Sequence, residues 1–479
     1  MKKSWLFFQK KHVLLFLAIL LICLFSISTI LYVLNRNPAF IVFNGLLPLA
    51  SIFLFKGKYR FYVFCFGITL VKFMSLTNWS YGSFFTWNVA LYSVVVFLEI
   101  LVKRAPLSTS QKRLLTFFSV FLICIFLAEL VNVENISLSK FATSLVYWFL
   151  VPAMIIDCKS KKDLKTAVIA FSAGLFISNI IPLIFLYFWK SQSVPFLSTY
   201  LPSVMDTFSI NGGSAFRFTG LLGDPNHNSC CILLASSLLL LSLFKDTSCP
   251  PTKKAITATS ITILCFQVFA FLGGSKTYLL CLLLLLVIFL VVKFRKSEFF
   301  LPALICFFSL LIIVFIVSAS NPYLYIYIKR FILIDTRMGL FHSLTTGRTS
   351  IYVSYISEML SDPFHLLFGH GIDVGASTTV FDKHSVIVEL FWDFGVLAAF
   401  VYSLFIGNIL KFKYHKAPIY YFLPILVFLF YGLTLHLVYK EYILVGFVIC
   451  YLFNKNYQEK QSEAPCLNKN RIENYEVSI

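Results

Sequence analysis

Long apolar runs recur from one end of the chain to the other, and they limit what it can fold into. Apolar residues make up 59% of the sequence and charged residues only 13%, against about 45–50% and about 25% in soluble domains. Many runs reach about 20 residues, the length that a helix needs to cross a bilayer. Strands of a membrane barrel would instead alternate in polarity. The sequence therefore predicts an all-α polytopic membrane protein.

Short polar links divide these runs into fourteen candidate spans. The first run is too long for the apolar core of a signal peptide, so it is interpreted as a span. The predicted spans cover residues 12–33, 38–55, 61–77, 84–102, 114–132, 141–157, 166–189, 228–244, 255–273, 277–292, 299–319, 385–410, 417–436 and 438–454.

The distribution of basic residues predicts the orientation. With the N-terminus in the cytoplasm, the cytoplasmic links and both termini hold 28 of the 40 Lys and Arg residues, as the positive-inside rule requires. The net charge of +19 is then a topology signal, and nucleic-acid binding is not predicted. Two long polar intervals, 189–226 and 320–383, face outward. So do six of the eight histidines: His227, His342, His365, His370, His384 and His436.

The sequence predicts neither a metal site nor a cofactor. Most of the 12 Cys residues lie inside predicted spans, and the chain has no CxxC pair. A zinc site or a disulfide framework normally shows such paired spacing. Buried Cys as a small apolar residue is the better interpretation.

The outer interval 320–383 contains a helical pattern that begins close to Arg348. Thr346 is a suitable N-cap, and Ile351, Tyr352, Tyr355, Ile356 and Met359 follow with helical spacing. Arg348 then lies in the first turn, where the helix dipole disfavours a cation by about 0.3–1 kcal/mol. Backbone N–H groups and a guanidinium could bind one phosphate there together. The alternative is an exposed arginine at small cost.

Two further outer segments carry a basic residue beside a turn. Arg217 lies between aromatic residues shortly before Asp224 and Asn226, and Lys276 follows a Gly-Gly-Ser turn. Asp or Asn ahead of a helix is an ordinary cap, and a lysine at a span end can extend to the water interface. Capping explains one of the two residues Asp224 and Asn226, but it does not explain why several polar residues and Arg217 occur together.

The predicted span 385–410 begins next to a histidine and contains two carboxylates. Glu389 and Asp393 are four residues apart, on one helical face. Carboxylates at membrane depth usually face the protein interior or a wet cavity. His384 could take a proton from a sugar hydroxyl, since histidine titrates near neutral pH. The alternative is a solvated histidine. For Lys329 and Arg330, which follow a tyrosine-rich run, contact with lipid headgroups is favoured.

Together, these segments resemble the O-antigen polymerase/ligase superfamily, membrane glycosyltransferases that handle polyprenyl-diphosphate-linked glycans. The resemblance covers about residues 216–397. Three positions depart from the family pattern: Lys276 replaces a common Arg, Ser385 a usual Asn, and Ala398 a frequent Gly. The matching pieces occur in family order: Arg217 to Gly220 with Asp224-Pro225-Asn226, Ser275-Lys276-Thr277, Gly347-Arg348 with Tyr352, and Gly369-His370-Gly371 with His384, Glu389, Asp393 and Gly395.

The resemblance implies an activity and a role for each residue. The matching motifs do not separate a polymerase from a ligase, but the aromatic-rich composition and the fourteen predicted spans favour a polymerase. It would join oligosaccharide repeat units, carried on a lipid such as undecaprenyl diphosphate, into capsular or O-antigen-like polysaccharide outside the cytoplasmic membrane. His384 would be the general base, and Arg217 and Arg348 would act on the leaving diphosphate. No metal is required, because fixed cations would neutralise the diphosphate. The substrate-binding residues would be Lys276, Asp224, Asn226, Tyr352 and Glu389.

The resemblance also implies an organisation and partners. An N-terminal bundle (1–215) would precede the polymerase-like region (216–410, with outer loop 320–384), two C-terminal spans (411–454) and a cytoplasmic tail (455–479). Membrane lipids, a flippase and a chain-length regulator are implied partners. Two alternatives remain: a ligase that moves finished glycan to a separate acceptor, and a transporter of lipid-linked glycan. Transporters place charges near the midplane on broken helices, whereas the polar residues here lie in outer segments.

Overall fold

A computed structural model describes part of the chain. Several expectations lie outside the described residues: the spans 12–33 (apart from a few positions) and 299–319, loop residues 320–347 with Lys329 and Arg330, and the tail 455–479. The described residues are 20, 23–24, 27–28, 31, 38–55, 57–70, 84–103, 107–135, 138–157, 164–190, 205–210, 213–244, 251–294, 348–372, 374–377, 383–409, 421–438 and 440–453.

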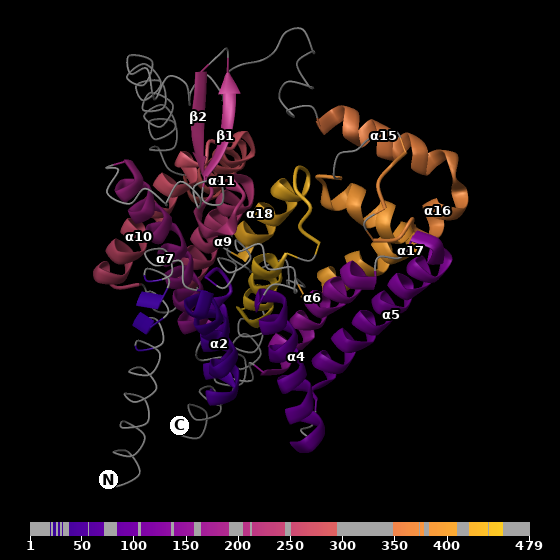
Figure 1. The fold of residues 1–479 in the computed structure, drawn as a ribbon, viewed down its shortest axis with the longest axis horizontal. Helices are drawn as coiled ribbons and strands as arrows, with labels where there is room; N and C mark the ends of the chain where they lie inside the picture. The colour runs from indigo at the N-terminus through magenta and orange to yellow at the C-terminus, as the bar shows by residue number, and fades with distance from the viewer. Residues whose placement is uncertain are drawn as a thin grey trace, which may run out of the picture.

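Helices form most of the described structure, as the apolar runs predict (Figure 1). Polar caps set some of the starts: Ser108 forms a reciprocal capping pair with Gln111, and Thr252 caps the helix that follows it. The helices that the structure describes in the first half are α2 (Pro38–Leu54), α3 (Lys58–Gly67), α4 (Phe84–Lys103), α5 (Thr109–Val131), α6 (Leu138–Asp157) and α7 (Leu164–Lys190), with the short 3-10 helix η2 (Val133–Asn135).

The second half of the chain adds further helices and one hairpin. Its described helices are α9 (Pro225–Phe244), α10 (Lys253–Leu272), α11 (Lys276–Phe294), α15 (Arg348–Ser361), α16 (Pro363–Phe368), α17 (Val386–Ile409), α18 (Leu423–Gly432) and an apolar helix, Glu441–Phe453. A 3-10 turn, η5 (Gly220–Leu222), precedes α9.

Several of these helices can cross a membrane. Within the described residues, six are long and apolar enough: those in α5, α6, α7, α9, α10 and α17. Shorter apolar helices cover Asn88–Val102, Lys276–Ile288, Leu423–Gly432 and Glu441–Phe453. The chain is therefore a mostly helical protein with the helices of a multi-pass membrane protein. The count of fourteen spans stays a prediction.

The interval 189–226, which is predicted to face outward, contains a β-hairpin that the sequence analysis did not predict. Strand β1 (Met205–Ile210) pairs antiparallel with β2 (Gly213–Phe218), and Met205 lies opposite Phe218. Figure 1 shows the hairpin projecting above α11 and α10. The hairpin places Arg217 one residue before the end of β2, close to the start of α9.

The helices follow one another as an arc of packed neighbours. From α17 the order runs through α5, α6, α4, α2, α3 and α7 to α9, which also packs against α10, α11 and α18. Figure 1 shows α18 between the group around α9 and the group formed by α15, α16 and α17. The arc therefore closes near α18, and segments far apart in sequence meet there.

Aromatic rings hold the α5, α6 and α17 part of the arc together. The ring of Phe121 on α5 lies 5.4 Å from that of Trp148 on α6 and 5.4 Å from that of Tyr402 on α17. Trp148 also meets Phe394 edge to face at 5.3 Å. Such pairs add about 0.5–1.5 kcal/mol each beyond the burial of their area. This packing fixes α17, which carries the predicted carboxylates, against the N-terminal helices.

Candidate functional site

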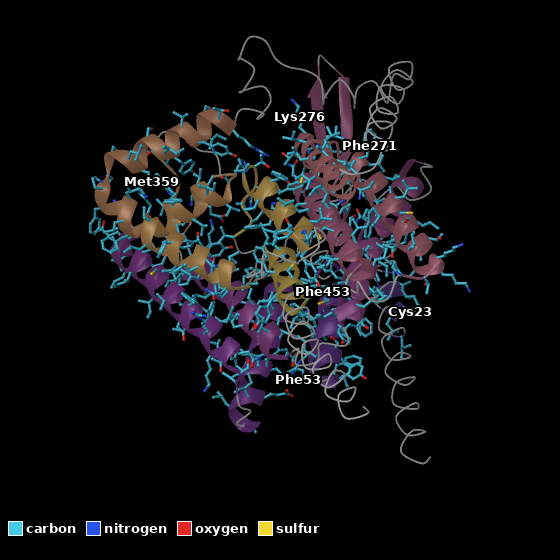
Figure 2. All side chains as sticks on the ribbon, turned by 180° about the vertical axis from the view of Figure 1, so that it is seen from behind. Cys23, Phe53, Phe271, Lys276, Met359 and Phe453 are labelled. Atoms are coloured by element: carbon cyan, nitrogen blue, oxygen red, sulfur yellow. The ribbon has the colours of Figure 1, made fainter. Side chains whose placement is uncertain are left out.

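The predicted outer residues gather at one end of the helices. Figure 2 shows Lys276, at the start of α11, at the opposite end of the molecule from Phe53, near the end of α2. The hairpin with Arg217 lies at the Lys276 end (Figure 1). The positive-inside rule predicts opposite sides of the membrane for Phe53 and Lys276.

Arg217 joins two segments that the sequence analysis treated separately. Its side chain is buried. Its Nε donates to the carbonyl oxygen of Gly273 at 3.1 Å, and its Nη2 donates to Oδ1 of Asn226 at 3.3 Å. Gly273 precedes Lys276 at the start of α11, and Asn226 lies in the first turn of α9. The guanidinium therefore fixes the starts of two helices next to each other.

Asp224 caps α9. Its Oδ1 accepts the backbone N–H groups of Asn226 at 2.7 Å and His227 at 2.9 Å. These bonds satisfy two of the N–H groups that every helix start leaves without a partner. The capping alternative is therefore confirmed for Asp224. The assignment of Asp224 to substrate binding stays a prediction. The same holds for Asn226, whose amide oxygen accepts a hydrogen bond from Arg217.

Lys276 is the first residue of α11 and is partly buried. The Ser275 hydroxyl beside it accepts the backbone N–H of Tyr278 at 3.3 Å, which is the geometry of a cap. An ammonium in the first turn of a helix adds to the positive end of the dipole. Such a site favours an anion.

Arg348 lies in the first turn of α15, as the helical pattern predicts; the predicted N-cap, Thr346, lies outside the described residues. Burial lowers the pKa of its guanidinium, while Tyr352 and Asp224 act in the opposite direction. An arginine still keeps its charge at neutral pH. The bond from Tyr352 to the His384 carbonyl and the ring contacts that lead from His384 to His227 in α9 place the start of α15 near the start of α9, which agrees with the effect of Asp224. Residues more than a hundred positions apart in sequence thus share one electrostatic environment.

Tyr352 ties α15 to the segment that carries His384. Its hydroxyl lies 3.0 Å from the carbonyl oxygen of His384 and 2.9 Å from that of Leu433, just after α18. His384 has a φ of 48°, a left-handed conformation that costs a residue with a side chain about 1–2 kcal/mol. The hydrogen bond from Tyr352 therefore helps to stabilise the strained backbone of His384, the residue expected to act as the general base.

Replacing Tyr352 with phenylalanine removes this hydroxyl and leaves the ring. We expect a loss of about 0.5–1.5 kcal/mol in the free energy of unfolding, the usual contribution of one hydrogen bond. Because the freed segment carries His384, kcat of the proposed reaction should fall more than KM rises. Thermal unfolding and kinetics of the purified variant measure both effects. Ser357→Ala, on the exposed side of α15, is the control; equal effects in the two variants would contradict the role given to Tyr352.

Three histidines from different segments form a row beside Tyr352. The rings of His384 and His436 lie 6.2 Å apart, and those of His436 and His227 lie 5.1 Å apart. Nδ1 of His227 lies 2.6 Å from the hydroxyl of Tyr442. The sequence analysis placed His227 and His436 on the outer side but gave them no role. Their outward placement was the signal that could have identified this row.

Two buried carboxyl groups lie on α17, in the helical turns that follow His384. Glu389 and Asp393 are both almost fully buried, as expected for carboxylates on a membrane helix. Lys383 forms an ion pair with Asp393, a contact that the sequence analysis missed. Within the described residues, Oε2 of Glu389 accepts no hydrogen bond. Because its side chain is buried, Glu389 lies in the protein interior, and its direct contact with substrate stays a prediction.

The Gly-His-Gly segment has a structural role at a break in α17. The helix departs from helical geometry at Gly395, with φ 73° and ψ 178°. A break leaves nearby carbonyl groups without helical partners. The N–H groups of His370 and Gly371 bond the carbonyl oxygens of Trp392 at 2.7 Å and Asp393 at 3.0 Å. A segment that the resemblance associates with activity thereby stabilises a discontinuous helix.

Adding a side chain at Gly395 should disrupt this contact. A Cβ there would lie 2.3 Å from the carbonyl oxygen of Leu367 and 2.7 Å from the backbone nitrogen of Gly369. The positive φ adds strain, and we expect Gly395→Ala to lower stability by about 1–3 kcal/mol. The loss of stability is measured from the fraction of protein that stays folded in detergent and from its melting temperature. Gly407→Ala, on the same helix with open space around its Cα, should be tolerated; a harmless Gly395→Ala would contradict the close approach.

A stack of rings joins this segment to the end of α5. His370 stacks on Trp392 with centroids 3.8 Å apart, and His365 stacks on His370 at 4.5 Å. Nε2 of His365 lies 3.1 Å from Oδ1 of Asn132. Burial and the nearby His365 lower the pKa of His370, so a neutral ring is favoured in the stack. His365 and His370 therefore stabilise the packing of this segment against α5 and α17. His384 is not part of this stack.

Among the described residues, no three His, Cys, Asp or Glu side chains are grouped so that they could hold a metal ion. The basic groups, helix starts and histidine row form the candidate site, which would suit an anionic ligand and proton transfer. A scan against protein-family models, a search of curated proteins and a search of solved structures each gave no match to this chain.

Proposed function

We propose that the protein is a membrane glycosyltransferase that polymerises polyprenyl-diphosphate-linked oligosaccharide repeat units. The product would be a capsular or O-antigen-like polysaccharide, made on the outer face of the cytoplasmic membrane. Both chain termini would lie in the cytoplasm. The observation that carries the proposal is that the starts of α9, α11, α15 and α17, which carry or adjoin Arg217, Arg348 and His384, lie close together. They are joined by the hydrogen bonds of Arg217 and Tyr352 and by the row of histidine rings.

The basic groups supply what a diphosphate leaving group needs. Fixed cations and the N–H groups of helix starts stabilise the negative charge that develops on the leaving oxygen. Arg348 could grip the diphosphate with two parallel hydrogen bonds, whereas Lys276 would act as a point charge. Arg217 already bonds the protein through Nε and Nη2, so its main contribution would be its charge and its fixing of the helix starts.

His384 would act on the acceptor sugar. The acceptor hydroxyl oxygen forms a bond to the anomeric carbon of the donor, while the bond from that carbon to the diphosphate oxygen breaks. The electron pair of the broken bond leaves with the diphosphate, and His384 takes the hydroxyl proton. The superfamily resemblance implies inversion at the anomeric carbon. Tyr352 would position His384 through its carbonyl group.

One observation favours the transporter alternative. The broken helix α17 carries the buried groups Glu389 and Asp393, and broken helices with buried charges are typical of transporters. The local contacts give this feature another explanation, because the Gly-His-Gly segment caps the break and Lys383 neutralises Asp393. The basic residues at the outer end then favour the enzyme.

Arg348→Ala tests the proposal at its most informative residue. Loss of one donor to a developing oxyanion lowers turnover by about 10²–10³-fold, so polymer should be almost absent from cells that make the variant. Polymer is measured by gel after normalisation to the amount of protein in the membrane. Lys329→Gln and Arg330→Gln, expected at lipid headgroups, are matched losses of charge and should have little effect. Wild-type amounts of polymer from Arg348→Ala would contradict the assignment.

A further inference from the structure

Helix α15 has three faces of different character. One face, formed by Ile351, Tyr355 and Met359, is buried and packs against Trp392 of α17. These positions are separated by four residues, so they follow one side of the helix. The sequence analysis included Ile356 in the helical pattern without assigning it to a face. Its side chain is 43% exposed, and it belongs to a second face.

That second face is apolar and exposed. It consists of Val353, Ile356 and Leu360, which are spaced by three and four residues and are 60%, 43% and 65% exposed. Single exposed apolar residues are normal on soluble surfaces. Three in one row along a helix of 14 residues indicate a surface that is covered by something apolar.

The third face is polar. Ser350, Ser354, Ser357 and Ser361 follow one another along the helix, and all are exposed or partly exposed. Glu358 lies beside them and accepts the backbone N–H of Ser377. An apolar row and a polar row side by side, both outside the protein core, are typical of a helix that lies in the plane of a membrane interface.

The neighbouring elements connect this helix to the lipid-facing surface. Helix α16 follows directly and exposes Phe364 and Leu367. It is held to the end of α5 by the contact between His365 and Asn132. Helix α5 is one of the helices long enough to span a membrane, and Leu130 in its last turn is 68% exposed. The exposed apolar residues thus continue from a spanning helix onto α16 and α15.

We infer that α15 lies in the boundary of the outer bilayer leaflet, with Val353, Ile356 and Leu360 among lipid acyl chains and the serine row toward water. The occupant of the apolar row is the bilayer itself. This placement does not depend on the proposed reaction. If that reaction is correct, the placement also explains how Arg348, at the start of α15, reaches the level of lipid phosphates, where a lipid-linked diphosphate would arrive.

Depth-dependent fluorescence quenching tests this inference. A coumarin amino acid is inserted by stop-codon suppression at Ile356 or, as the matched control, at Ser357, in full-length protein reconstituted into vesicles. Bromine on the upper acyl carbons of the phospholipid should quench the probe at 356 and leave the probe at 357 much brighter. Iodide, equilibrated across the vesicles by freezing and thawing, should give the reverse order. The probe at 356 should also emit at shorter wavelength.

The pair Leu360 and Ser361 repeats the comparison one turn later, in case a probe at 356 or 357 disturbs the fold. Strong iodide quenching at 356 and 360, without quenching by bromolipid, would place the row in water and overturn the inference. Quenching by neither agent would show that protein covers the row, which would overturn it as well. Neither result would bear on glycosyl transfer, which is measured separately by polymer formation.

Discussion

His384→Asn is expected to reduce polymer formation by about 10²–10⁴-fold, the usual contribution of a positioned general base. Asparagine is the sharpest replacement, because it tolerates the left-handed backbone that His384 adopts but has no basic nitrogen. Loss of activity would then follow from loss of the base and not from backbone strain. The initial rate of glycan formation by purified protein gives the readout.

The pH profile separates a base from a structural residue. The wild-type rate should fall on acidification, since protonation of the base removes its capacity to accept a proton. The small residual rate of His384→Asn should lack that fall. Melting temperature and elution volume check that the variant is folded. A folded His384→Asn variant that retains the wild-type rate would remove His384 from the mechanism.

Arg60→Ala is expected to cost about 3–5 kcal/mol of stability, because breaking a buried ion pair leaves a charge without a partner. Arg60 on α3 donates through Nε and Nη2 to both carboxylate oxygens of Asp157 on α6, at 3.0 Å and 2.8 Å. Nη2 also bonds Glu99 on α4 at 3.0 Å. The pair is buried, with side-chain exposures of 1% for Arg60 and 4% for Asp157.

A double variant identifies the cause. Arg60→Met with Asp157→Leu removes both charges and keeps apolar volume, so it should recover much of the lost stability. Arg113→Ala, an exposed basic residue near the start of α5, should change stability by less than about 0.5 kcal/mol. Unfolding in a denaturing detergent series measures all three. If Arg60→Ala were as harmless as Arg113→Ala, the ion pair would not stabilise the fold.

The positions of many helices could be predicted from the sequence, because a bilayer requires continuous apolar runs with internally paired backbones. The runs predicted at 84–102 and 141–157 correspond closely to α4 and α6. Helix α3 (Lys58–Gly67) covers the first part of the predicted span 61–77, of which residues 71–77 lie outside the described residues. The start of α15 at Arg348 was also predictable, since cap and apolar spacing are local signals.

The hairpin was missed although the sequence contains a signal for it. Phe208 and Ile210, then Phe216 and Phe218, alternate with other residues on either side of Asn211-Gly212, and Asn-Gly between alternating segments is a strong hairpin pattern. The segment was interpreted only as a polar interval. The contact of Arg217 with Gly273 and Asn226 depends on this hairpin, so it could not be derived without it.

The remaining contacts join residues that are distant in sequence. The pairs Arg60 with Asp157, Tyr352 with Leu433, and His227 with Tyr442 depend on how the arc of helices closes. Apolar periodicity predicts which face of a helix is buried, but it does not predict which other helices pack against that face. The site residues could therefore be named individually from their surroundings, whereas their meeting near α18 required the structure.

The most direct test of the central claim uses purified protein, a lipid-diphosphate-linked repeat unit and a gel of the glycan products. A polymerase uses its own substrate as acceptor, so we expect a ladder of regularly spaced lengths with no other acceptor added. One new band that forms only when a separate acceptor is supplied would instead indicate a ligase. Absence of any product under both conditions, with folded protein, would contradict glycosyl transfer and favour the transporter alternative.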